Sequence, residues 1–199
     1  HEGIHTFAAS GQNSAELTIG LLIEEILSAV AICIAVIFAL RLIGKLRTIV
    51  VSKVPLSPIS GGLVSGIILG LVASQQPIIL FSGHHEIQTL LEGEFNSTNL
   101  ISLAALKILV LAVCLAGGWF GGQIFPLGFI GASLGLAFCA FFDPSQMLTF
   151  AAVGFAAAIT VGLRKPLLCF ILAIILFPQF TWLPILIATG IGTAFMRSE

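Results

Sequence analysis

A glycine-rich stretch that ends in a proline, GGQIFP at residues 121–126, is the part of the sequence best suited to bind a small anion. Glycines leave the main-chain amides uncovered, and proline suits the first turn of a helix. At a helix start the N–H groups have no acceptor within the helix, and together they carry about half a positive charge. We therefore expect the backbone amides of Gly122, Gln123, Ile124 and Phe125 to bind an anion without a side-chain cation.

Three basic side chains are candidates for charges that act on such an anion. Lys107 lies within an apolar stretch, and Arg164 and Lys165 come directly before Pro166. We expect Lys107 to pair with a carbonyl or a helix end rather than with a substrate. Arg164 and Lys165 are expected to mark an aqueous edge of the protein. All three are candidate vestibule charges that could draw anions toward the site.

Two glutamates, Glu24 and Glu25, lie in the first long apolar stretch, near its start. A carboxylate within a membrane span is a candidate for a functional role. Because both residues are close to one end of the span, we favour side chains that reach out to the outer interface over a proton-relay role.

The sequence contains no pattern that predicts catalysis, a metal or a cofactor. It has no serine elbow, P-loop or dinucleotide-binding fingerprint, so we predict no catalytic residues and no enzyme activity. His84, His85 and Glu86 are adjacent, but adjacent histidines seldom form a closed metal site without a third and a fourth ligand. We therefore predict neither a metal nor a cofactor.

The composition indicates which elements must position these residues. Hydrophobic residues make up 58% of the 199 residues and charged residues 9%, against about 25% charged residues in soluble domains. A chain with so few charges must place its apolar surface against lipid or between lipid-facing helices. With a net charge of -1, it also lacks the basic surface that nucleic acid requires. We predict a multi-pass integral membrane protein in the lipid bilayer that binds no nucleic acid.

Three regions follow one another along the chain. Residues 1–16 form a polar segment that we place outside the membrane, and residues 17–54 form a long transmembrane helix followed by a basic linker. Half of the basic residues of the chain lie in this linker: Arg41, Lys45, Arg47 and Lys53. The positive-inside rule therefore places the linker in the cytoplasm. Residues 55–199 form the third region, with the ion-binding helix start at 121–127.

Helices in the third region are predicted to be short and broken. Several apolar runs are shorter than the roughly 20 residues that an upright crossing needs. These runs are Phe125–Phe142, Ser145–Leu163, Pro166–Phe177 and Trp182–Met196. Non-helical backbone at membrane depth is tolerated where it lines a pathway or is buried in protein, so the pattern favours a transport protein. We predict an all-α membrane protein, a bundle of tilted, broken transmembrane and re-entrant helices.

Two sets of glycines recur at helical spacing and predict close packing of backbones. The first set is Gly62, Gly66 and Gly70, and the second is Gly128, Gly131 and Gly135. Glycines on one helical face allow the backbone of another helix to approach closely, as is common between membrane helices. The second set follows the candidate anion site directly, so we expect it to hold that helix against a neighbour.

Residues 121–135, GGQIFPLGFIGASLG, resemble the glycine-x-phenylalanine-x-proline signature and the following helix of the CLC chloride channels and chloride/proton antiporters. The resemblance covers essentially residues 17–197. Further matches occur in the order and spacing of the family, at 81–83, 152–157, 163–167 and 183–188. Two positions depart from the signature: Ile124 stands where the family has phenylalanine, and Gln123 replaces a small apolar residue.

The resemblance implies that residues 55–199 form the second inverted repeat of a CLC-type fold, within the carboxy-terminal portion of a longer transporter. It also implies that the amides of Gln123 and Ile124 contact a central chloride, which is the transported substrate. The amino-terminal half of the same transporter would supply the gating glutamate and a serine contact. Members of the family are homodimers, so we expect a homodimer, in a bacterial inner membrane.

The predicted function is transmembrane chloride transport, as part of a CLC-type voltage-gated channel or chloride/proton exchanger. Two alternatives remain open. One is a structural or dimerisation segment without transport, and the other is an unrelated secondary transporter that shares broken helices by convergence.

Overall fold

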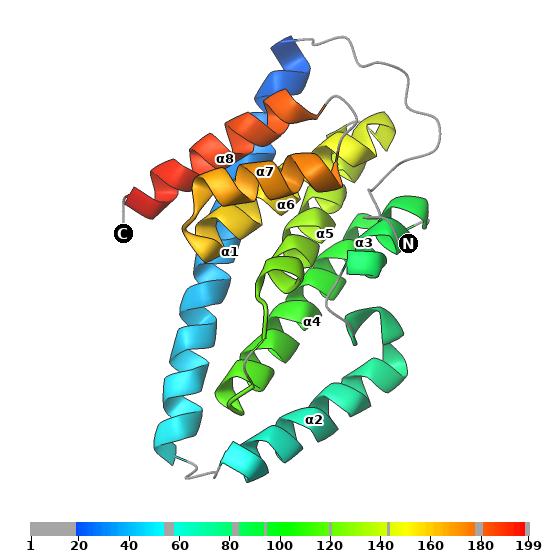
Figure 1. The fold of residues 1–199 in the computed structure, drawn as a ribbon. Coiled ribbons are helices and arrows are strands. Elements are labelled where there is room, and N and C mark those ends of the chain that lie inside the picture. Colours follow the sequence, from blue (N-terminus) through cyan, green and yellow to red (C-terminus); the bar gives the residue numbers. More distant parts are fainter. Residues whose placement is uncertain are drawn as a thin grey trace, which may run out of the picture.

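The computed structural model describes residues 19–53, 58–80, 84–93, 95–119, 121–142, 144–177 and 181–197. In this part of the chain the regular structure is helical, with no strand (Figure 1). Its α-helices are α1 (Ile19–Lys53), α2 (Pro58–Gln75), α3 (His84–Glu92), α4 (Ser97–Ala116), α5 (Ile124–Phe142), α6 (Met147–Leu163), α7 (Pro166–Leu176) and α8 (Trp182–Arg197). Two short 3-10 helices are η1 (Pro77–Ile79) and η2 (Pro144–Gln146). The predicted all-α class is confirmed, and the polar segment 1–16 lies outside the described residues.

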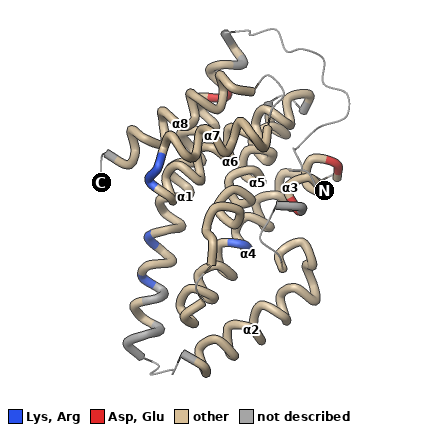
Figure 2. Tube along the Cα trace, in the orientation of Figure 1, with Lys and Arg blue, Asp and Glu red and all other residues tan. Residues whose placement is uncertain are grey.

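The first helix is longer than predicted. Its 35 residues run from Ile19 to Lys53, so the basic residues expected in a linker lie on the helix itself. Lysine, arginine and leucine favour helix, and no proline interrupts the run before Pro55. At 1.5 Å per residue α1 is about 52 Å long, well beyond a hydrocarbon core of about 30 Å. Figure 2 shows its basic positions in the half that leads toward α2.

Long and short apolar helices are mixed in the described part of the chain. The stretches long and apolar enough to cross a membrane are Leu22–Lys45 in α1, Ser97–Ala116 in α4 and Ile124–Phe141 in α5. Helices α6, α7 and α8 are apolar but shorter. The 11 residues of α7 extend over only about 16 Å, so this helix cannot cross a bilayer. The expected bundle of long and broken helices is confirmed, and the chain is an integral membrane protein.

Helix α6 forms the centre of the bundle. Every residue from Phe150 to Val161 is buried, and α6 packs against α1, α5, α7 and α8. The backbones of α5 and α6 touch at small residues. A Cβ at Gly131 would clash with the carbonyl oxygen of Gly154, and a Cβ at Gly135 would clash with the carbonyl oxygen of Phe150. The predicted close packing of the α5 glycines is confirmed, and the pairing shows that α5 and α6 run antiparallel.

Candidate functional site

Helix α5 begins partway along the bundle rather than at its end. After α4 the chain turns back beside that helix, and α5 starts at Ile124 (Figure 1). The N–H of Leu127 donates to the carbonyl oxygen of Gln123 at 3.1 Å and closes the first turn. Because Pro126 has no N–H, the donors of this helix start are the amides of Gln123, Ile124 and Phe125.

The predicted anion-binding residues lie together at this helix start. Gly122 is exposed, and Gln123, Ile124 and Phe125 are half-buried. A Cβ built at Gly122 would find no atom within 4 Å, so the space beside this backbone is open. Residues 121–142 contain no Lys, Arg, Asp or Glu, so the positive charge that this segment itself supplies comes from peptide dipoles. Such a site suits an anion, and binding at these four residues stays a prediction.

The turn that ends α4 depends on glycine. Gly118 has a φ of 85°, in the left-handed region that favours glycine. The N–H of Trp119 donates to the carbonyl oxygen of Cys114 at 3.0 Å, and the N–H of Gly118 donates to that of Leu115 at 3.3 Å. These two bonds form the Schellman motif, which satisfies the last carbonyls of a helix. The motif reverses the chain and leads it toward the start of α5.

Helix α2 supports this turn from the other side. Ser65 Oγ donates to the carbonyl oxygen of Val113 at 3.2 Å, which joins α2 to α4. Trp119 Nε1 donates to the carbonyl oxygen of Gly62 at 3.1 Å. A Cβ at Gly117 would clash with Ser65 Oγ, so the two backbones approach closely. The position of the turn between α4 and α5 therefore depends on α2.

The predicted close approach of a second backbone at the α2 glycines is wrong, because a side chain lies there at Gly62 and Gly66. A Cβ at Gly62 or Gly66 would contact the indole ring of Trp119 at 3.6 Å. At Gly70 the prediction is wrong, because a Cβ there would meet no atom within 4 Å. Trp119 was not predicted as a supporting residue. Its signal in the sequence is an aromatic residue within an otherwise glycine-rich loop.

Replacing Trp119 by alanine is expected to loosen the loop that leads to α5. The change removes the hydrogen bond to Gly62 and the ring contacts with α2, a loss of about 2 kcal/mol in unfolding free energy for a partly exposed indole. The purified protein should unfold at a lower temperature. Trp119→Phe keeps a ring but loses the N–H, so it should lose only about 1 kcal/mol. Equal unfolding temperatures for all three proteins would contradict this role.

Lys107 lies on α4 and is only 4% exposed. Its Nζ donates to the carbonyl oxygen of Ile79 at 2.9 Å and lies 5.3 Å from the centroid of the Phe129 ring. The expected pairing with a carbonyl is confirmed. Because Phe129 belongs to α5, the ammonium group lies against the first half of that helix. Its action on an anion stays a prediction.

Glu86 of α3 is a buried acidic residue whose charge acts on Lys107. It is 8% exposed, and its negative charge attracts the Lys107 charge. Its Oε2 atom has no hydrogen-bond partner among the described residues. From the sequence, Glu86 is only a weak candidate for a metal ligand in a polar segment. The signal for its burial is the helical spacing of Ile87, Leu90 and Leu91, which bury one face of α3.

Arg164 and Lys165 lie on an exposed turn between α6 and α7. Arg164 ends α6 with a φ of 55°, and its N–H donates to the carbonyl oxygen of Thr160 at 3.0 Å. Two residues earlier, a Cβ at Gly162 would clash with Leu127 in the first turn of α5. The turn and the start of α5 therefore lie at the same end of the antiparallel α5–α6 pair. The vestibule role of Arg164 and Lys165 stays a prediction.

The interpretation of Glu25 as a side chain at the outer interface is wrong. Glu25 is 1% exposed, whereas Glu24 is half-buried. Position 25 lies on the same face of α1 as the buried residues Ser28 and Ile32, and this face packs into the bundle. Both carboxylate oxygens of Glu25 have no hydrogen-bond partner among the described residues. Proximity to the end of a span did not predict exposure, because the neighbouring helices cover this side.

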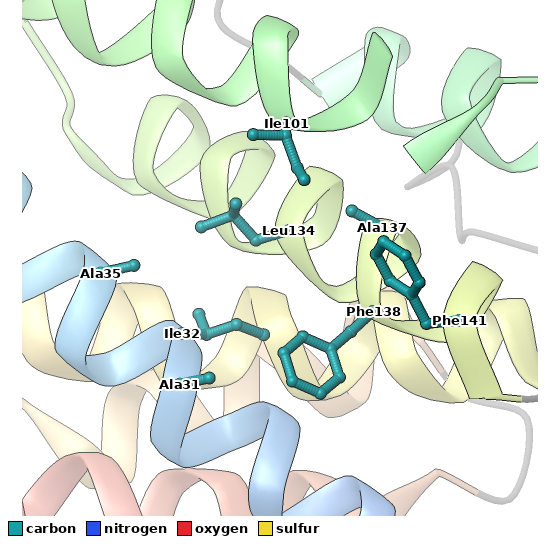
Figure 3. A pocket seen from close by; sticks show the side chains of 8 residues that line it. All are labelled: Ala31, Ile32, Ala35, Ile101, Leu134, Ala137, Phe138 and Phe141. Carbon is teal, nitrogen blue, oxygen red and sulfur yellow. The ribbon is translucent and has the colours of Figure 1, made fainter. Parts of the chain in front are cut away.

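An apolar cavity of about 450 Å³ lies between α1, α4 and α5 (Figure 3). Its walls are hydrocarbon side chains, among them Ile32, Ile101, Leu134 and Phe138. Such a lining offers no side-chain donor to an anion, so the cavity is distinct from the site at the start of α5. Within the described ranges, no group of three or more His, Cys, Asp or Glu side chains could hold a metal ion.

Comparison with known sequences gives a match over almost the whole chain. The family model described as voltage gated chloride channel matches residues 3–197. Relatives named as the ion-transport protein YfeO share 32% identity over 127 residues in Escherichia coli SMS-3-5 and 40% over 77 residues in Escherichia fergusonii. These matches cover 63% and 38% of this chain, and 30% and 18% of the relatives. The matched segments therefore span less than a third of the length of these relatives.

Solved structures match the fold. The crystal structure of a CLC-type fluoride/proton antiporter has a TM-score of 0.79 at 17% identity, over 98% of this chain and 49% of that one. A slow cyanobacterial Cl-/H+ antiporter has the same TM-score and identity, over 99% of this chain and 48% of that one. At this identity the likeness shows the fold alone. The chain has the fold of about half of such a protein.

Proposed function

The chain belongs to the voltage-gated chloride channel family, and from this premise we propose that it forms part of a chloride transport pathway across a membrane. The observation that carries the proposal is the start of α5, where a membrane-spanning helix with first-turn N–H donors follows directly on the open space beside Gly122. Chloride is held there by Gly122, Gln123, Ile124 and Phe125 at the positive end of the helix. Because no side-chain cation holds the ion directly, chloride can leave as readily as it enters.

We place the remaining chloride contacts in the amino-terminal half of the same transporter. One helix start contributes up to about 2 kcal/mol toward an anion, whereas taking an ion out of water costs several kcal/mol. The α5 start therefore needs other helix ends, hydroxyls or retained water. The matched antiporter structures are about twice as long as this chain, which leaves room for a first repeat in the amino-terminal half. In this proposal residues 55–199 are the second inverted repeat.

Basic side chains supply an entry for the anion. Arg164 and Lys165 are exposed at the same end of the α5–α6 pair as the binding residues. In a low-dielectric surrounding, clustered positive charge raises the local concentration of anions and speeds their arrival. We therefore assign Arg164 and Lys165 to the aqueous vestibule, and Lys107 to the protein interior behind α5.

The proposed assembly is a homodimer in a bacterial inner membrane. Helices α7 and α8 carry exposed large hydrophobic side chains, including Leu167, Ile171, Trp182 and Leu186, which suit contact with a second copy or with lipid. Relatives from Escherichia support a bacterial membrane. The proposal includes no enzyme activity and no cofactor, and chloride is the transported substrate.

Reconstitution of the full-length polypeptide into liposomes tests the proposal. Vesicles loaded with chloride should release it down its gradient once the protein is present. A change of internal pH that follows the chloride gradient identifies a chloride/proton exchanger, and its absence identifies a channel. Folded, dimeric protein without chloride flux would refute transport and favour a structural or dimerisation segment.

A further inference from the structure

Two buried groups of opposite charge, Lys107 on α4 and Glu86 on α3, lie on helices that both pack against α5. Lys107 of α4 is 4% exposed, Glu86 of α3 is 8% exposed, and the two charges attract each other. Lys107 Nζ is fixed by the carbonyl oxygen of Ile79 at 2.9 Å and by the face of the Phe129 ring at 5.3 Å. Phe129 is about one turn beyond Phe125 on α5, so the ammonium group is held near the first turns of that helix.

Packing alone does not account for these two charges. Taking a charge out of water is costly, and a hydrophobic pair of similar volume often packs two helices at least as well as a buried ion pair. A hydrophobic pair cannot supply an electric field at α5. Lys107 is the only charged residue in the sequence of α4, and α5 has none. Glu92, the other acidic residue of α3, is exposed.

We propose that this buried pair sets the strength of anion binding at the start of α5. Lys107 adds positive potential at the site without touching the ion, and Glu86 limits that potential. The inference rests on the proposed chloride transport. A pathway needs a site that attracts the ion but releases it quickly, and a balanced pair of fixed charges provides both.

Two charge-removing substitutions should shift chloride affinity in opposite directions. A unit charge on the order of 10 Å from an ion changes its binding constant roughly ten-fold at an effective dielectric constant near 20. Lys107→Met keeps the apolar stem and removes the charge, so chloride should bind roughly ten-fold more weakly. Glu86→Gln keeps the shape and removes the opposing charge, so chloride should bind a few-fold more tightly.

Isothermal titration of the full-length protein in detergent with chloride, at constant ionic strength, measures these shifts. Lys107→Arg keeps the positive charge and should retain most of the wild-type affinity. Glu92→Gln is the matched control, because it removes the same charge from an exposed position of the same helix. It should leave chloride affinity unchanged. A purely structural role would lower the unfolding temperature without opposite shifts in affinity.

Each outcome decides between the inference and the function on which it rests. Chloride binding by the wild-type protein that neither Lys107→Met nor Glu86→Gln changes would overturn the inference and leave chloride transport standing. A folded wild-type protein that neither binds nor transports chloride would refute the proposed function instead. If Lys107→Met does not fold, Glu86→Gln decides alone: tighter binding supports the inference, and unchanged or weaker binding overturns it.

Discussion

Valine in place of Gly122 is expected to stop chloride flux in a protein that still folds. Gly122 is exposed and has no positive φ, and a Cβ there would meet no atom within 4 Å. The valine side chain therefore clashes with nothing in this chain. It fills the space beside the α5 start and covers the amides that we assign to the anion. Loss of one helix-start interaction of about 2 kcal/mol corresponds to a roughly 30-fold loss of binding.

Chloride efflux from liposomes and the unfolding temperature, measured on the same preparation, test this prediction. Gly70→Val is the matched control. Gly70 is also exposed, and a Cβ there also meets no atom within 4 Å, but it lies on α2. The control should transport chloride at the wild-type rate. Wild-type flux from folded Gly122→Val would place the anion elsewhere and remove the main argument for the site.

Local patterns were sufficient to predict the helices that build the site. Apolar runs bounded by prolines gave α7 its start at Pro166 and placed α5 within one residue of its observed start at Ile124. These predictions hold because proline and glycine act on the backbone at their own position, whatever surrounds them. The α5 glycines were equally informative, because a missing side chain permits close approach to any partner helix.

Contacts between distant helices could not be predicted in the same way. Periodicity shows which face of a helix is apolar, but not which helix covers it. Glu25 is one example, because its burial depends on the helices packed around α1. Glu86 and Lys107 are a second example, since they are 21 positions apart and their charges act on each other only because α3 and α4 both pack against α5. The support of the α5 start by Trp119 likewise depends on α2.

Alanine in place of Gly131 is expected to disrupt the packing of α5 against α6. Its Cβ would clash with the carbonyl oxygen of Gly154 and with the Cβ of Ala158. A backbone carbonyl cannot rotate away as a side chain can, so α5 and α6 would have to separate. Overpacking costs about 1–3 kcal/mol where side chains adjust, and we expect at least about 3 kcal/mol here. Thermal unfolding in detergent and the yield of monodisperse protein measure the loss.

Gly44→Ala separates this steric cost from the general effect of replacing a helical glycine. Gly44 is exposed on α1, and a Cβ there would meet no atom within 4 Å. Because alanine favours helix over glycine by up to about 1 kcal/mol, this variant should be as stable as wild type or more stable. The two Gly→Ala changes should therefore have opposite signs. Equal stability of Gly131→Ala and Gly44→Ala would mean that α5 and α6 do not touch through their backbones.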